Sequence, residues 1–147
     1  MNEGPGSGGY FSQEGSGTPT AEAFVADLDA SSPYQLAEGI LVRAVAGHRC
    51  MVNLVEMNRG SEAPLHSHDE EQIVVVLDGS VVFEIEGEER IVSKGEAIVI
   101  PSWVLHRAVG HAEVSHTVEV FSPPRAALLD LMGDTANTPS TLAPERR

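Results

Sequence analysis

Short apolar segments separated by turn residues run from residue 40 to residue 121, and this spacing restricts the chain to an all-β fold. The dipeptides Asp78-Gly79 and Glu86-Gly87 are typical of tight hairpin turns, and Lys94-Gly95 precedes a further strand. The pattern therefore predicts an antiparallel meander. Its expected strands cover residues 40–45, 50–57, 72–77, 81–85, 89–92, 97–100 and 115–121.

The two ends of the chain differ in composition from this central part. Residues 1–19 are rich in glycine, serine and proline, which favours a flexible tail. Residues 21–28 have near-helical apolar spacing and could form a short helix or an arm that packs on a neighbouring subunit. A short helix is expected over residues 125–132, with disorder from residue 134. We therefore divide the chain into a tail with a possible arm (1–33), one domain (34–125), and a helix with a disordered tail (126–147).

Charge excludes some classes of partner. The chain has 22 acidic and 9 basic residues and a net charge of -13, so nucleic acid or an anionic membrane would be repelled at long range. The sequence has no apolar run of membrane-spanning length, and we expect a cytoplasmic protein. Cys50 is the single cysteine, which fits a reducing compartment, and its apolar neighbours predict a buried, unreactive thiol.

Three histidines and a glutamine have the spacing of a metal site. In a strand, His66 and His68 project to the same side and can share one ion. Gln72 opens the next apolar segment, and the turn after Pro101 could bring His106 to the same place. Imidazole nitrogens with an amide oxygen suit a first-row divalent ion, which could be Zn, Ni, Fe or Mn. The alternative is that these histidines serve only as hydrogen-bonding groups in a pocket.

The same residues match the pattern of a known family. Gly60, His66, His68, Gln72 and Gly79 resemble the first cupin motif, with Gln in place of the usual Glu, and Gly95, Pro101, Leu105 and His106 resemble the second. The resemblance covers roughly residues 36–125. It implies a single-domain cupin jelly roll, an antiparallel β-barrel with the metal inside one end, and a homodimer. Trp103 stands where the second motif normally has glycine, and we expect its ring to pack against the barrel end.

Within the cupins, residues 66–72 and 118–125 resemble the pectin-degradation type that opens unsaturated uronate rings. That type has an aspartate at the place of Glu119 and a phenylalanine matching Phe121, so the resemblance implies an acid/base carboxylate and a ring that faces the substrate. Glutamate is one methylene longer, which suggests a different substrate or pose. The alternative is that Glu119 is a solvated strand residue. We expect Arg125 to cap the helix or to pair with a surface acid.

These residues predict a metal-dependent enzyme. A neutral Gln72 leaves a bound ion with its full charge, which favours Lewis-acid activation of a carbonyl or hydroxyl oxygen. With proton transfer, this would isomerise, tautomerise or ring-open a polar small molecule such as a sugar acid or a natural-product intermediate. Two alternatives are an iron-dependent dioxygenase or biosynthetic tailoring enzyme, which would consume oxygen, and a non-catalytic ligand-binding cupin.

Overall fold

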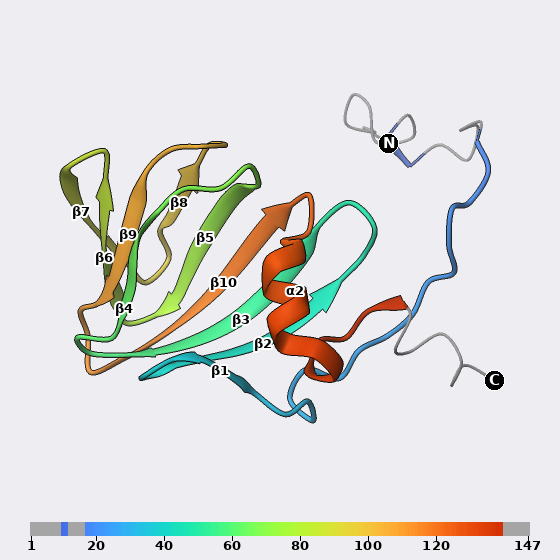
Figure 1. Cartoon of the computed structure of the whole chain (residues 1–147), viewed down its shortest axis with the longest axis horizontal. Helices are drawn as coiled ribbons and strands as arrows, with labels where there is room; N and C mark the ends of the chain where they lie inside the picture. Colours follow the sequence, from blue (N-terminus) through green and yellow to red (C-terminus); the bar gives the residue numbers. More distant parts are fainter. Residues whose placement is uncertain (1–9, 12–16, 140–147) are drawn as a thin grey trace, which may run out of the picture.

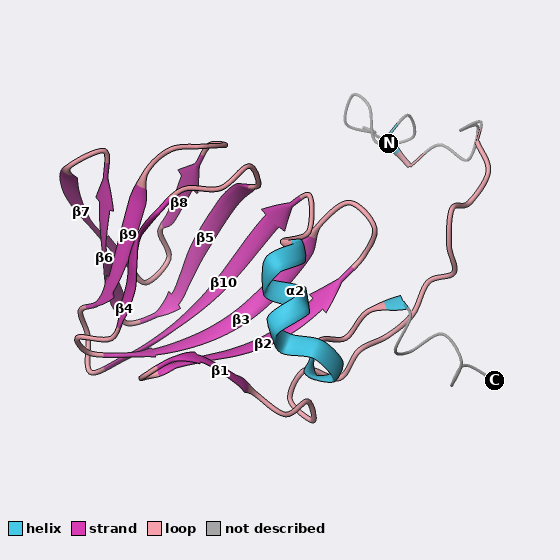
Figure 2. Ribbon diagram, viewed as in Figure 1, coloured by secondary structure: helices cyan, strands magenta, loops and turns pink. Residues whose placement is uncertain are grey.

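A computed structural model of the 147-residue chain describes residues 10–11 and 17–139. Within these residues, ten strands form two antiparallel sheets (Figures 1 and 2). The larger sheet has the order β1 (Tyr34–Ala37), β2 (Ile40–Ala46), β3 (Met51–Asn58), β10 (Val114–Ser122), β5 (Glu71–Asp78) and β8 (Ala97–Ile100). The smaller sheet has the order β4 (Glu62–His66), β9 (His106–Gly110), β6 (Ser80–Ile85) and β7 (Glu88–Ser93).

The core lies between the two sheets, because the central strands alternate strictly between buried and less buried residues. In β2 and β3 every second residue is buried, as period-two apolar patterning requires. The largest fully buried side chains come from both sheets and include Phe83, Met51, Ile100, Val42, Val74 and Val81. The all-β prediction is therefore confirmed, as a two-sheet jelly roll whose sheets stay separate.

The prediction of a meander is wrong, because β10 lies between β3 and β5 in the larger sheet. The turn at Asp78-Gly79 is likewise not a hairpin, since β5 and β6 belong to different sheets and the chain crosses between them there. Gly79 has φ 81°, and a Cβ atom on it would lie 2.5 Å from Ser115 Oγ. Only glycine fits this crossing. The hairpin at Glu86-Gly87 is confirmed, with Ile85 opposite Glu88.

Strands β1, β4 and β9 fall outside the predicted set. β4 contains Pro64 and has no strict alternation of apolar residues, so sequence pattern alone does not reveal it. It can tolerate the proline because it lies at the edge of the smaller sheet. This strand and its partner β9 carry two of the predicted metal ligands, His66 and His106.

The flanking segments differ in part from expectation. Residues 21–27 are not helical, and Val25 is 92% exposed. Helix α2 (Ala126–Met132) forms as predicted, and a 3-10 turn, η1 (Gly133–Thr135), follows it. Asn137, where disorder was predicted, accepts a bond from the Ala46 amide and donates one to the Ala44 carbonyl. The remainder of both predicted tails, residues 1–9, 12–16 and 140–147, lies outside the described residues.

Two further findings concern the surface. Cys50 is exposed, so the prediction of a buried thiol is wrong: it precedes the first residue of β3 instead of lying in the strand. In the described part of the chain, no helix has the length and apolar character needed to cross a membrane.

Candidate metal centre

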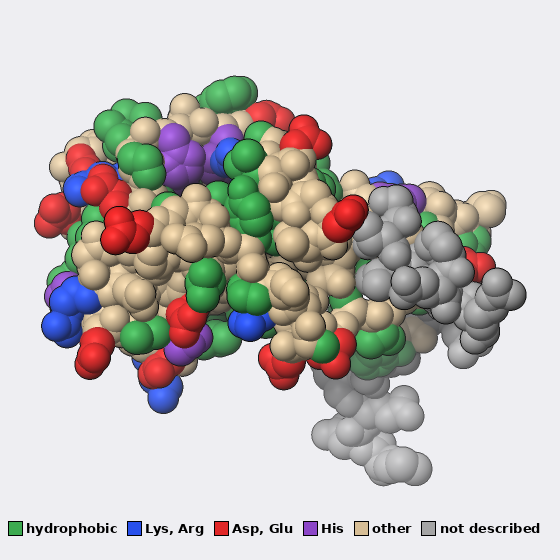
Figure 3. All heavy atoms as spheres, turned by 60° about the horizontal axis from the view of Figure 1, so that its bottom comes forward, with side chains coloured by type: hydrophobic (Ala, Val, Ile, Leu, Met, Phe, Trp, Pro, Cys, Tyr) green, Lys and Arg blue, Asp and Glu red, His purple; other side chains and the backbone are tan. Residues whose placement is uncertain are grey.

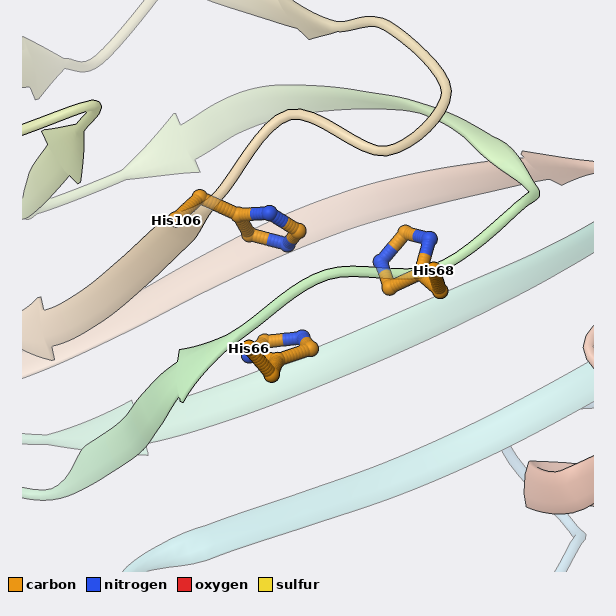
Figure 4. Close-up of side chains that lie close together, drawn as sticks. All are labelled: His66, His68 and His106. Atoms are coloured by element: carbon orange, nitrogen blue, oxygen red, sulfur yellow. The ribbon is translucent and has the colours of Figure 1, made fainter.

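The three predicted histidines converge on one point (Figure 4). His66 ends β4, His106 begins β9, and the two are directly opposite one another in the ladder that joins these strands. His68 follows in the loop after β4. The ring centroids of His66 and His106 are 4.3 Å apart, and one potential ligand atom from each of the three rings lies within 4.8 Å of the others. Strand pairing therefore brings together ligands that are far apart in the sequence.

Backbone carbonyls fix the protonation of all three rings. Nδ1 lies 2.6 Å from the Pro64 carbonyl in His66, 2.9 Å from the Glu70 carbonyl in His68 and 2.8 Å from the Val104 carbonyl in His106. A carbonyl oxygen only accepts, so Nδ1 must carry the proton and Nε2 keeps its lone pair. Metal-binding histidines are usually oriented by this kind of bond.

Two of these Nε2 atoms have no hydrogen-bond donor opposite them in the described part of the chain. His106 Nε2 is buried and has no hydrogen-bond partner. His68 Nε2 lies 3.2 Å from Gln72 Oε1, so two acceptors face each other. A shared cation resolves both problems, whereas turning the Gln72 amide around would resolve only the second. The donor set therefore fits a first-row divalent ion.

Burial favours the neutral form of the His68 and His106 imidazoles. It lowers the pKa of His106 to about 4, and it also lowers the pKa of His68, since removal from water disfavours the charged ring. Neutral rings are the form that binds a metal ion. His68 and His106 can thus bind an ion at neutral pH without first losing a proton.

A cavity of about 320 Å³ opens beside the histidines, and His66, Gln72 and His106 line one end of it. Figure 3 shows histidine side chains gathered next to a basic side chain on this part of the surface, with hydrophobic side chains around them. Glu119 and Phe121 of β10 also line the cavity. The volume is in the lower part of the range of small-molecule sites.

Glu119 lies in the central part of the larger sheet and faces this cavity. Its strand neighbours are Asn53 on β3 and Val74 on β5. Burial raises the pKa of the Glu119 carboxyl to about 7, against the opposing effect of the positive charge on Arg125. This raised pKa is not expected for a solvated carboxyl, so the alternative that Glu119 is a solvated strand residue does not hold. Phe121, on the same face, places its ring centroid 5.8 Å from that of His68.

Arg125 differs from its prediction. It immediately precedes α2, but its side chain makes no capping bond, and no ion pair to it is found in the described part of the chain. Its guanidinium carbon lies 5.8 Å from the centroid of the Phe121 ring, and the residue lines the cavity. The side chain therefore presents an uncompensated positive charge beside Glu119.

Comparison with known proteins agrees with this geometry. A family model described as a cupin domain matches residues 53–121. The pectin degradation protein KdgF of Dickeya dadantii (strain 3937) is 32% identical over 105 residues, which are 69% of this chain and 96% of that protein. The chain belongs to the cupin family. The solved structure of KdgF from Halomonas sp. is 33% identical with a TM-score of 0.65, covering 69% of this chain and 95% of that one. An RmlC-like cupin from Shewanella frigidimarina, 19% identical with a TM-score of 0.67 over 73% of this chain and 96% of that one, shares the fold.

Trp103 shows how this cupin departs from the usual motif. Its φ is 66°, in the left-handed region that favours the glycine normally found there. The prediction that its ring packs against the barrel end is wrong, since the residue is 66% exposed. Its backbone N–H donates to the His68 carbonyl at 2.8 Å and so helps to position the loop that carries His68.

Sequence reasoning missed Asn53. This residue of β3 lines the cavity, is 1% exposed, and has a side-chain oxygen without a hydrogen-bond partner. The available signal was its register: Asn53 occupies an inward position between the buried residues Met51 and Val55. A polar residue there costs stability unless something else satisfies it.

Proposed function

We propose that this cupin is a metal-dependent enzyme that combines Lewis-acid activation with proton transfer to isomerise, tautomerise or ring-open a small molecule. His66, His68, Gln72 and His106 would hold the ion. One observation carries the proposal: the converging imidazoles of three histidines and the carboxyl of Glu119, with its raised pKa, belong to one site. Groups with strongly perturbed pKa values gathered in a cleft are typical of active sites.

A divalent ion bound there would polarise a carbonyl oxygen of the substrate, and the neutral Gln72 would leave the ion its full charge. Glu119 then takes a proton from the carbon beside that carbonyl and returns it to another atom of the substrate. A pKa of about 7 lets one carboxyl both accept and donate a proton near neutral pH. The substrate rearranges without net gain or loss of protons or electrons.

Two further residues complete the proposed site. Phe121 would form the cavity wall beside the reacting carbon, since its ring lies near both the His68 ring and the guanidinium group of Arg125. Arg125 would meet an anionic group of the substrate, because its charge has no protein partner within the described residues. A planar guanidinium is well suited to a carboxylate.

The name of the relative from Dickeya dadantii links it to pectin degradation, and the 32% identity extends over nearly all of that protein. This supports the ring-opening version of the proposal. The dioxygenase alternative has less support, because Gln72 removes the carboxylate of the arrangement of two histidines and one carboxylate found in many oxygen-activating iron enzymes.

The first experiment is elemental analysis of protein purified without chelator, compared with a His66→Ala, His106→Ala double variant. His116→Ala is the matched control, because this histidine is exposed and lies 3.5 Å from Glu56, away from the cavity. We expect near-stoichiometric metal in the parent and the control and none in the double variant. If the parent protein held no metal, even after incubation with divalent ions, the proposed metal-dependent enzyme function would be refuted. An oxygen electrode tests the dioxygenase, which requires substrate-dependent oxygen consumption.

The homodimer, the cytoplasmic location and the domain bounds of 34–125 remain predictions. Light scattering of the purified protein tests the first of them, and a monomeric mass would contradict it.

A further inference from the structure

We propose that the substrate has an apolar body, such as an aromatic ring, joined to an enolisable keto-acid head, and that it is not a polyhydroxylated sugar acid. This inference rests on the proposed function, since it assigns the head to the metal end of the same cavity. It differs in substrate class from what the pectin-degradation resemblance implies.

The wall of the cavity is divided into two chemically different parts. Histidines, Gln72, Glu119 and Arg125 form the end where the ion would bind. Most of the other lining residues are apolar, and the larger ones besides Phe121 are Leu36, Ile40, Phe83, Leu128 and Leu131. The other polar residues of the lining are Asn53 and Glu62, and Glu62 already pairs with Arg107 on the smaller sheet.

A sugar acid does not fit this division. Each of its hydroxyl groups needs a hydrogen-bond partner once it leaves water, and a buried hydroxyl without one weakens binding strongly. Among the described residues, Asn53 and Thr117 are the two other side chains of the larger and smaller cavities that have a buried polar atom without a partner, which is fewer than the hydroxyl groups of a sugar acid such as 2-keto-3-deoxygluconate. An apolar body needs no such partners and gains affinity from the area that it buries.

The apolar wall also continues inward. A smaller cavity of about 50 Å³ shares Leu36, Ile40 and Phe83 with the larger one. It reaches between the two sheets to Val42, Val55 and Met57. Glu119 and Thr117 also line this smaller cavity, and the buried Thr117 hydroxyl has no hydrogen-bond partner within the described residues, so the wall is apolar except for these two groups.

The rim of the cavity is apolar as well. Leu131 of α2 is 61% exposed and Leu36 of β1 is 40% exposed, and both line the cavity. In Figure 1, α2 lies over the larger sheet, near β10, β3 and β2. A bound apolar body would cover these leucines, while the unpaired charge of Arg125 indicates that the occupant carries an anionic head, whose oxygens an ion held by the imidazoles would also attract. This combination identifies a small molecule as the occupant.

The test uses two probes with the same CH2–CO–COO⁻ head, phenylpyruvate and 2-keto-3-deoxygluconate, which differ in an aromatic or a hydroxylated body. Their dissociation constants are measured by titration calorimetry on the full chain with its metal restored. We expect phenylpyruvate to bind at least about tenfold more tightly, with a negative heat-capacity change that marks apolar burial. Equal affinities, preference for the sugar acid, or no binding of either probe would each overturn the inference. The last outcome would mean that another part of the chain or a second copy fills the cavity.

Two substitutions locate the preference. Leu131→Asn adds a polar group to the rim without charge and should reduce the affinity ratio of the two probes by about threefold or more, an effect of the lost apolar area. Leu77→Asn is the control, because Leu77 is 51% exposed on β5 and lies outside the cavity lining. Unchanged ratios in both variants would overturn the assignment of the apolar wall. Metal content of each variant verifies that the ion site is intact.

Proton transfer is read separately, by deuterium exchange of the CH2 group in heavy water with NMR detection. A tenfold preference without exchange would support the substrate class and contradict the proposed proton transfer. Exchange on both probes with equal affinity would support the proposed function and contradict the substrate class.

Discussion

Glu119→Gln should change stability in a pH-dependent way that only a buried carboxyl can produce. Burial raises the pKa of Glu119 from its ordinary value of 4.5 to about 7. The folded state therefore holds the proton more tightly than the unfolded state between these pH values, and stability falls as pH rises through them. At about 1.36 kcal/mol per pH unit, the interval of 2.5 corresponds to a penalty of up to about 3 kcal/mol above pH 7. Glutamine does not ionise and escapes this penalty.

The assay is thermal unfolding at pH 4.5, 6 and 8 in the presence of a chelator, because a bound ion would alter the electrostatics. We expect similar midpoints for the parent and Glu119→Gln at pH 4.5, where the carboxyl is protonated. At pH 8 the variant should be more stable by up to about 12 °C, given a shift of roughly 4 °C per kcal/mol. Glu89→Gln is the control, since Glu89 lies exposed on β7 and should change the midpoint little at any pH. A Glu119→Gln variant that behaves like this control would refute the buried acid/base group.

Three more outcomes follow from the site. Gln72→Glu should retain the metal but lower turnover by about tenfold or more, because the carboxylate would neutralise part of the ion's charge. Metal content and turnover rate are measured on the same preparation, and an unchanged rate would contradict this prediction. Asn53→Leu should raise the free energy of unfolding by about 1 kcal/mol, since a buried unsatisfied oxygen is removed. The same substitution should lower turnover. Denaturant unfolding and enzyme kinetics measure the two effects, and full activity of the variant would show that Asn53 does not belong to the active site. Because the pKa of His106 is lowered to about 4, the stability gained from its neutral ring is present above pH 6.5 and is lost as pH falls toward 4. Denaturant unfolding of metal-free Glu119→Gln protein, in which the opposite titration of Glu119 is absent, measures this at pH 8, 6 and 4; a free energy of unfolding that does not fall toward pH 4 would contradict it.

The ligand set could be predicted from the sequence because its geometry is mostly local. His66 and His68 are separated by one residue, so they lie close together although β4 ends at His66 and strand alternation does not place His68, and the family spacing supplied His106. What spacing alone does not contain is the ladder that places His66 opposite His106, which requires β4 to pair with β9 across a separation of 40 residues or more. Strand pairing over that distance is decided by packing of the whole sheet.

The errors have the same cause. A turn sequence such as Asp78-Gly79 predicts that the chain bends or reverses, but it does not indicate which sheet the next strand joins. The passage of the chain from one sheet to the other was therefore predicted as a hairpin. Arg125 looked like a surface residue because helix starts are usually exposed. Its approach to Phe121 depends on where α2 lies against the larger sheet, and no residue in 125–132 encodes that position by itself.

Polar residues at inward-facing strand positions also point to the site, and motif-based prediction missed them. Asn53, Thr117 and Glu119 occupy buried or cavity-facing positions on the adjacent strands β3 and β10, where their neighbours are Met, Val and Phe. Asn53 and Thr117 each have a buried oxygen without a hydrogen-bond partner, and Glu119 holds a carboxyl that burial makes hard to ionise. Each of these features lowers stability, and apolar side chains of similar size would fit the same positions. Three such residues next to the three histidines that could hold a metal ion therefore indicate that this end of the sandwich is shaped by the groups it binds, whereas the rest of the interior is shaped by packing.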